Sequence, residues 1–144
     1  MTNVLIQDSG FVEDDFGREI IDWEETTTPE WHGFKGYGLH VPNTVSADEL
    51  QPHFKGVALI RIDFPNFADG RGFSIARHLR LLGYSGRLRA FGHIIADQYT
   101  MARRCGFDEV EVDQSLATRQ PLEDWQSRAN WRAHNYLARM QQAV

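Results

Sequence analysis

The spacing of hydrophobic residues changes repeatedly between residues 56 and 113, and these changes predict alternating strands and helices. The run GVALIRIDF is almost continuously apolar and β-branched, which predicts a strand covered on both faces at residues 56–64. Apolar residues then recur at helical spacing as far as Gly83, where a left-handed helix end fits; they are Ile75, Ala76, Leu79 and Leu82. RLRAF at residues 87–91 predicts a second strand, and FDEVEV at residues 107–112 predicts a third.

A second helix is predicted between the last two strands. It begins near His93 and Asp97 and ends at Gly106, and its apolar stripe consists of Ile94, Ile95, Tyr99, Ala102 and Cys105. The pattern therefore predicts an α/β protein with a central β-α-β-α-β unit, of half-barrel or small three-layer type. Connections of this length make the strands parallel and the units right-handed, so the loops that follow the strands share the carboxyl edge of the sheet. Ligands of such sheets bind at that edge.

The first 53 residues predict an acidic N-terminal arm that packs on the main domain at residues 54–144, in one folding unit. VLIQDSGFVEDD predicts a β-hairpin about its Ser-Gly turn, and GLHVP predicts a short strand before Pro42. Ser46 and Glu49 have the spacing of a capping box, which predicts a short helix as far as His53.

The C-terminal segment PLEDWQSRANWRAHNYLARMQQ predicts a long helix from Pro121, with acids in its first turn and arginines towards its end. One face is apolar, and Trp131 lies off that face. An aromatic residue in such a place indicates contact with a partner or with the N-terminal arm.

The net charge of −5 is divided unevenly: residues 1–50 hold 11 acidic and 2 basic residues, whereas residues 51–144 hold 9 acidic and 13 basic ones. A body with this many interspersed acids lacks the basic stripe of a nucleic-acid-binding protein, so we expect no nucleic-acid partner. The acidic front is then expected to lie near arginines of the chain's own body.

The remaining composition limits the location of the protein and its metal chemistry. No apolar run approaches about 18 residues and no export signal begins the chain, so we expect a cytoplasmic protein without membrane contact. The single Cys105 cannot form an internal disulfide, and no Cys/His spacing suits zinc, so no metal site is predicted. Cys105 falls on the apolar stripe of its helix and is expected to fill space in the core.

The segment DGRG, between the first predicted strand and its helix, is a candidate anion site. Its glycines allow a close approach of a ligand, the helix start offers unpaired N–H groups, and Arg71 can add a forked contact. The candidate residues are Asp69, Gly70, Arg71, Gly72 and Ser74. In the alternative interpretation the segment is only a turn, in which Asp69 bonds nearby amides and Ser74 caps the helix.

Further polar residues are expected at the same carboxyl edge: Asp63, Arg89, His93, Asp97, Gln98 and Asp113. His93 and Asp97 are four residues apart on one helix face, a spacing that can orient a general base. The alternative is a structural ion-pair cluster that ties the loops together, since the pattern shows no nucleophile beside its base. Gln98 lies on the apolar stripe, so we expect its amide to bond a loop carbonyl or the DGRG turn.

The blocks FPNFADGRGFSIARHLR, GYSGRLRAFG, ADQYTMARRCGF and DEVEV resemble the bacterial domain-of-unknown-function family 934 over about residues 54–113. That family has no established activity. Its genes commonly lie beside those for sulfite reductase and assimilatory sulfate reduction, and members are often labelled oxidoreductases on that basis. Members often have Asp at the position of His93 and an apolar residue at that of Arg61.

Two functions follow from the resemblance and the residues together. The first is an accessory protein of assimilatory sulfite reduction, which docks on sulfite reductase or another sulfur-assimilation protein. The second is a small oxyanion-binding enzyme or sensor that uses the DGRG loop. No cofactor is expected, because the sequence has no flavin, nicotinamide, iron–sulfur or haem fingerprint. A sheet of only three parallel strands would be narrow, which favours a homodimer.

Overall fold

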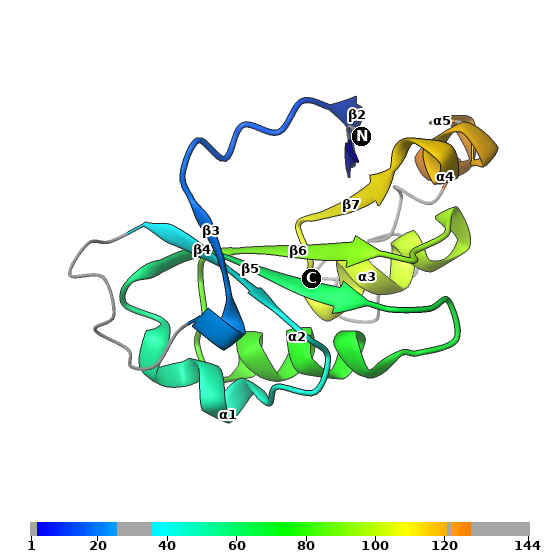
Figure 1. Ribbon diagram of the computed structural model, residues 1–144. Coiled ribbons are helices and arrows are strands. Elements are labelled where there is room, and N and C mark those ends of the chain that lie inside the picture. Colours follow the sequence, from blue (N-terminus) through cyan, green and yellow to red (C-terminus); the bar gives the residue numbers. More distant parts are fainter. Residues whose placement is uncertain (1–2, 26–35, 121, 128–144) are drawn as a thin grey trace, which may run out of the picture.

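The computed structural model describes residues 3–25, 36–120 and 122–127 of the 144-residue chain. Trp131 and the larger part of the helix predicted from Pro121 lie outside these residues. Within the described residues the chain forms a single seven-stranded sheet with helices packed against it (Figure 1). The predicted α/β class is therefore confirmed.

The strands are β1 (Asn3–Gln7), β2 (Gly10–Val12), β3 (Ile20–Asp22), β4 (Tyr37–Val41), β5 (Val57–Phe64), β6 (Arg87–Gly92) and β7 (Glu109–Asp113). They lie in the order β2-β1-β7-β6-β5-β4-β3. Strands β3 to β7 run parallel to one another, whereas β1 and β2 form an antiparallel hairpin, and β1 pairs antiparallel with β7. The predicted hairpin and the parallel course of the central strands are both confirmed.

The first 53 residues supply strands to both edges of this sheet. The β1–β2 hairpin lies beside β7, while β3 and β4 lie beside β5. The expectation of a homodimer rested on a sheet of three strands, and the seven strands remove that reason.

The helices are α1 (Ala47–Leu50), α2 (Arg71–Leu81), α3 (Tyr99–Cys105), α4 (Gln114–Arg119) and α5 (Leu122–Ser127), with single 3-10 turns η1 (Trp23–Glu25), η2 (Gln51–His53) and η3 (Ala96–Gln98). Helices α1 to α3 lie on one side of the parallel strands (Figure 1). The capping box is confirmed at α1, where Ser46 Oγ accepts from Glu49 N and Glu49 Oε2 accepts from Ser46 N. None of the helices in the described part of the chain combines the length and apolar character needed to span a lipid bilayer.

The second predicted helix begins later than the apolar stripe indicates. Ile95 is extended, and its N–H donates to the side chain of Gln98 at 3.0 Å. A 3-10 turn follows, and the α-helix starts only at Tyr99. The prediction of a helix from about His93 was therefore wrong at its start, because buried Ile94 packs in the core from a non-helical segment.

Arg80 joins the two helix-to-strand turns at the amino edge of the sheet. Its guanidinium donates to the carbonyl oxygens of Tyr84, Gly86 and Gly106, at distances between 2.7 and 3.1 Å. It also pairs with Asp108, whose carboxylate accepts from Leu88 N. One side chain thus satisfies carbonyl groups in both helix-to-strand turns.

The core between the sheet and α2 depends on a close approach of the helix to Phe64. The Phe64 ring lies at the end of β5 and packs against Phe73, with ring centroids 4.9 Å apart. A Cβ atom on Gly72 would lie 2.5 Å from the Phe64 ring. Gly72 is therefore the residue that lets the first turn of α2 reach the sheet.

We expect Gly72→Ala to lower the free energy of unfolding by about 1–3 kcal/mol, because the new methyl group overpacks a rigid ring. Urea denaturation measures the loss. Ser74→Ala is the control, because Ser74 lies two residues further along α2 at an exposed site. It should change stability by less than about 0.5 kcal/mol. In a Phe64→Leu background the cost of Gly72→Ala should shrink. An equal cost in both backgrounds would contradict this account of Gly72.

Candidate functional site

The face of the sheet opposite α1 to α3 is charged rather than apolar. Strand register places Arg61, Arg89 and Glu109 side by side on β5, β6 and β7. The alternation in RLRAF and EVEVD puts Arg87 and Glu111 on the same face. We call this set of five residues the ionic face.

Arg89 lies at the centre of the ionic face, and its side chain is fully buried. Its guanidinium contacts Glu109 at 2.7 Å and Glu111 at 2.8 Å. Nη1, which also contacts Glu111, and Nη2 donate to the two carboxylate oxygens of Asp14, each at 3.0 Å. Three carboxylates therefore surround one buried cation.

The N-terminal residues complete this network. Arg87 pairs with Glu109 at 2.8 Å and with Asp15 at 2.6 Å. From β1, Asn3 donates to Glu111 and Gln7 donates to Glu109. The expectation that the acidic front lies near arginines of the body is thus confirmed.

Asp14 and Asp15 lie in the segment 13–19, which joins β2 at one edge of the sheet to β3 at the other (Figure 1). The hydrogen bond from Arg89 holds the pKa of Asp14 below its ordinary value, and the hydrogen bond from Arg87 does the same for Asp15. Burial alone would lower the pKa of Arg89, but its contacts with Asp14 and Glu109 raise it overall. Each partner is therefore held in its charged form at neutral pH.

Nearer the carboxyl edge, Arg61 links this network to His40. Its Nε donates to His40 Nδ1 at 2.9 Å, its Nη1 contacts Glu111 at 3.2 Å, and its guanidinium lies 4.5 Å from the centre of the Phe91 ring. Burial, followed by the charge of Arg61, lowers the pKa of His40. His40 is therefore a neutral acceptor at Nδ1, with its proton on Nε2.

A cavity of about 240 Å³ opens beside His40 at this edge, and three carboxylates line it: Asp22, Glu24 and Asp63. No three carboxylate, histidine or cysteine side chains of the described residues gather as a metal site. The surplus of acids around this cavity disfavours an oxyanion there.

The DGRG loop, at the start of α2, bonds to itself. Arg71 donates from Nε and Nη2 to the two oxygens of Asp69, at 3.0 and 2.7 Å, and Arg71 N also donates to Asp69. Gly70 is the N-cap, and Ser74 makes no capping bond. The Asp69 carboxylate, whose pKa is held low by Arg71 and then by Asn43, thus occupies the position that an external anion would need.

The predicted carboxyl-edge residues fall into separate places. His93 and Asp113 line one cavity and Asp63 another, whereas Asp97 lines the groove between α2 and α3. Arg89 belongs to the ionic face and Arg71 to the DGRG loop, and the carboxylates that pair with Arg89 are not the one that pairs with Arg71.

Gln98 is held within the loops of this edge. Its Nε2 donates to the carbonyl oxygen of Phe67 at 3.0 Å, while its Oε1 accepts from Ile95 N. A loop carbonyl was one of the two partners that the sequence led us to expect.

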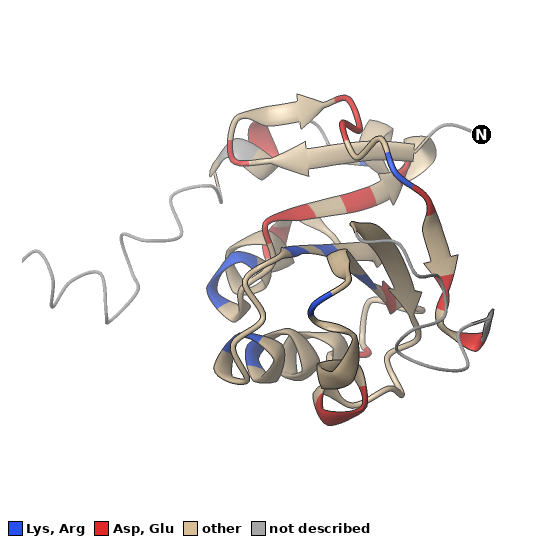
Figure 2. Ribbon diagram, turned by 90° about the vertical axis from the view of Figure 1, so that its left-hand side faces the viewer, with Lys and Arg blue, Asp and Glu red and all other residues tan. Residues whose placement is uncertain are grey.

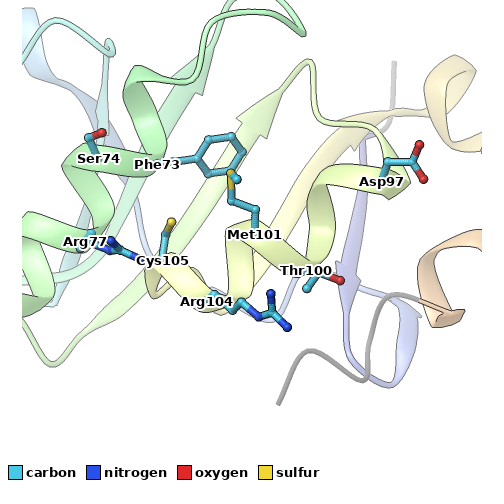
Figure 3. A pocket seen from close by; sticks show the side chains of 8 residues that line it. All are labelled: Phe73, Ser74, Arg77, Asp97, Thr100, Met101, Arg104 and Cys105. Atoms are coloured by element: carbon cyan, nitrogen blue, oxygen red, sulfur yellow. The ribbon is translucent and has the colours of Figure 1, made fainter. Parts of the chain in front are cut away.

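A larger cavity, of about 450 Å³, is a groove between α2 and α3 on the outer side of the helical layer. Figure 3 shows Ser74 and Arg77 on α2, with Thr100 and Arg104 on α3. Phe73, Met101 and Cys105 supply its apolar part. Burial raises the pKa of Cys105, so this residue remains an uncharged thiol at neutral pH.

The sequence interpretation missed Glu109, Glu111 and His40 as members of a polar network. A signal was present, since charges alternate at the same spacing in RLRAF and EVEVD, two neighbouring parallel strands. Such alternation predicts one ionic and one apolar face. No comparable signal marks the groove between α2 and α3, which depends on how two helices pack.

Comparison with known proteins identifies one family. The family model described as "Bacterial protein of unknown function (DUF934)" matches residues 38–144. No curated protein gives a significant match to the chain.

We expect Arg89→Met to lower the free energy of unfolding by about 3–5 kcal/mol, because it leaves buried carboxylates without their cation. Chemical denaturation measures this. Arg71→Met is the matched control: the Arg71 side chain is 61% exposed and its ion pair is screened by water, so its loss should change stability little. Equal losses in the two variants would contradict the central place of Arg89.

We expect the stabilising effect of Asp14 to depend on pH. The folded state lowers the pKa of Asp14, so the contribution is present above its ordinary value of 3.8 and is lost as the pH falls through the folded value. Wild-type protein should therefore exceed Asp14→Asn in stability at pH 7, and the gap should close at strongly acidic pH. Denaturation curves at several pH values measure the gap. In an Arg89→Met background the gap should be small at every pH; a persistent gap would point to another partner.

Proposed function

Because the chain belongs to the DUF934 family of bacterial proteins, we propose that it is an accessory protein of assimilatory sulfite reduction. In this proposal it binds sulfite reductase or another sulfur-assimilation protein through the outer surface of α2 and α3. The pathway comes from the genes that commonly neighbour those of the family, and the surface comes from the groove between the two helices.

The observation that carries the proposal is the combination of apolar and basic side chains at this groove. Met101, which lines the groove on α3, is 55% exposed, and Leu81, which lies outside the lining on α2 four residues after Arg77, is 79% exposed. Arg77 forms no ion pair with any residue that the structure describes, and Arg104 lies across the groove from it. Exposed apolar side chains beside arginines are typical of a protein-binding surface.

The positive charge beside the groove favours an acidic partner surface. Figure 2 shows Lys and Arg on helices of this layer as well as on central strands, and Asp and Glu mainly on strands and loops but also on α1. A carboxylate-bearing segment with its own apolar residues would complement Arg77 while covering Met101. We therefore expect an acidic, amphipathic segment of the partner to occupy the groove.

A binding role is also supported by the ionic face. Arg89 is paired with Glu109 and Glu111. Arg61 is hydrogen-bonded to His40. Cys105, the single thiol of the chain, has a raised pKa and contributes to the core. These contacts are those of a scaffold rather than of an activated nucleophile with its base.

We expect purified sulfite reductase to bind the full chain, with an affinity that Arg77→Glu weakens about tenfold or more, because it places a like charge against an acidic partner. Isothermal titration calorimetry at low and high salt measures this, and salt should weaken binding of the wild type more than that of the variant. Lys55→Glu, a charge reversal at an exposed residue that lines a different cavity, is the control and should bind as the wild type does.

Two outcomes would overturn the proposal: no binding of the wild type to sulfite reductase or to other purified sulfur-assimilation enzymes, or equal binding by Arg77→Glu. The oxyanion alternative is tested in parallel. Sulfite, sulfate, phosphate and adenosine 5′-phosphosulfate should leave the melting temperature unchanged at millimolar concentration, since Asp69 already occupies the DGRG loop. A shift that Arg71→Met abolishes would favour that alternative.

A further inference from the structure

A separate cavity of about 310 Å³ lies at the carboxyl edge of β6 and β7, away from the α2–α3 groove. Three elements supply its apolar wall: Phe67 from the loop between β5 and α2, Phe91 from β6 and Leu116 from α4. Polar side chains at the same cavity include those of Asn3, His93 and Arg119. Apolar walls with a few convergent polar groups are the usual features of a small-molecule site.

Phe67 is the first feature that points to a ligand. Its side chain is 43% exposed, yet its main chain is fixed on both sides. Gln98 donates to the carbonyl oxygen of Phe67 at 3.0 Å, and Asn66 accepts from the next N–H, that of Ala68, at 2.9 Å. The Phe67 ring also packs edge-on against His93, with centroids 5.2 Å apart. An aromatic ring held in place at the surface is already arranged to stack on a planar partner.

His93 and Gly92 shape the adjoining part of the cavity. Gly92 has a φ angle of +110°, and a Cβ atom there would lie 2.8 Å from the carbonyl oxygen of Phe64. The same oxygen accepts from His93 N at 3.0 Å and faces His93 Nδ1 at 3.2 Å. Since a carbonyl oxygen only accepts, Nδ1 carries the proton and Nε2 of the neutral ring is an acceptor.

The polar groups at this cavity offer both donors and acceptors. Asp113 accepts from Leu116 N and Ser115 Oγ, and both bonds use its Oδ1 atom. Glu111 is neutralised by Arg89 and Arg61. Arg119 is exposed, and its Nε makes one long bond of 3.4 Å to Ser115 O. A ligand with a mixed edge fits this set better than a simple anion does.

We propose that this cavity binds a planar nitrogen heterocycle that has either a single ring or two fused rings. The heterocycle stacks on Phe67 and turns its polar edge towards Arg119 and His93. The volume is near the lower end of the range of small-molecule sites, about 300–1,000 Å³, which excludes a whole dinucleotide. The inference does not depend on the proposed docking function, because the cavity and the groove have no lining residue in common.

The test uses lumazine, a planar bicyclic ring with donors and acceptors, as the probe. It is titrated to millimolar concentration into the ¹⁵N-labelled full chain, with 2-piperidone, a non-planar cyclic amide, as the comparison compound. We expect lumazine to shift the backbone amide signals of Gly92, His93 and Leu116, and 2-piperidone to shift none of them. Adenine, a second planar heterocycle, distinguishes a general preference for planar rings from one for pteridines.

Two substitutions link binding to the cavity. Phe67→Leu should weaken lumazine binding about tenfold, because it removes the stacking surface. Arg119→Gln should weaken it less, because it keeps donors but removes the charge. Phe11→Leu is the control, since Phe11 is 40% exposed on β2 and does not line the cavity, and its affinity should equal that of the wild type. Absence of shifts with both planar probes, equal affinity of Phe67→Leu, or equal binding of 2-piperidone would each overturn the proposal.

Discussion

The burial of one arginine constrains the whole sheet. A buried guanidinium is tolerated only where carboxylates and hydrogen bonds replace its lost water, and Arg89 obtains these from β7 and from the segment 13–19. A shift in the register of β6 against β7 would move Arg89 away from Glu109 and into the apolar layer. The charged network thus fixes the pairing of the central strands and attaches the N-terminal residues to them.

This constraint divides the molecule into surfaces with different tasks. The helix-facing side of the sheet is apolar and holds the core around Phe64 and Phe107. The ionic face is occupied by its own ion pairs. The places that neither side fills include the groove between α2 and α3 and the cavities at the carboxyl edge. The proposed docking surface and the proposed heterocycle site therefore both lie outside the apolar core and the ionic face.

The DGRG loop shows how a sequence pattern can have several physical origins. Two glycines around an arginine are expected of an anion site, but here Gly72 allows close packing on Phe64 and Arg71 is paired with Asp69. Phe67, which precedes the loop, is held by the hydrogen bond from Gln98. Local spacing specified a tight loop before a helix, and it also placed Asp69 beside Arg71, whereas the partner of Phe67 lies 31 residues away in the sequence.

The order of strands and helices between residues 56 and 113, the capping box at Ser46 and the N-terminal hairpin could all be predicted from the sequence, because each depends on local periodicity, turn residues and helix caps. The width of the sheet, the burial of Arg89 and the separation of Asp63, His93 and Asp97 could not. These follow from which strands become neighbours, and that is decided by contacts between residues such as Asp14 and Arg89, 75 positions apart. Local chemistry thus determined the elements, whereas long-range pairing of charges and packing of rings decided which side chains meet.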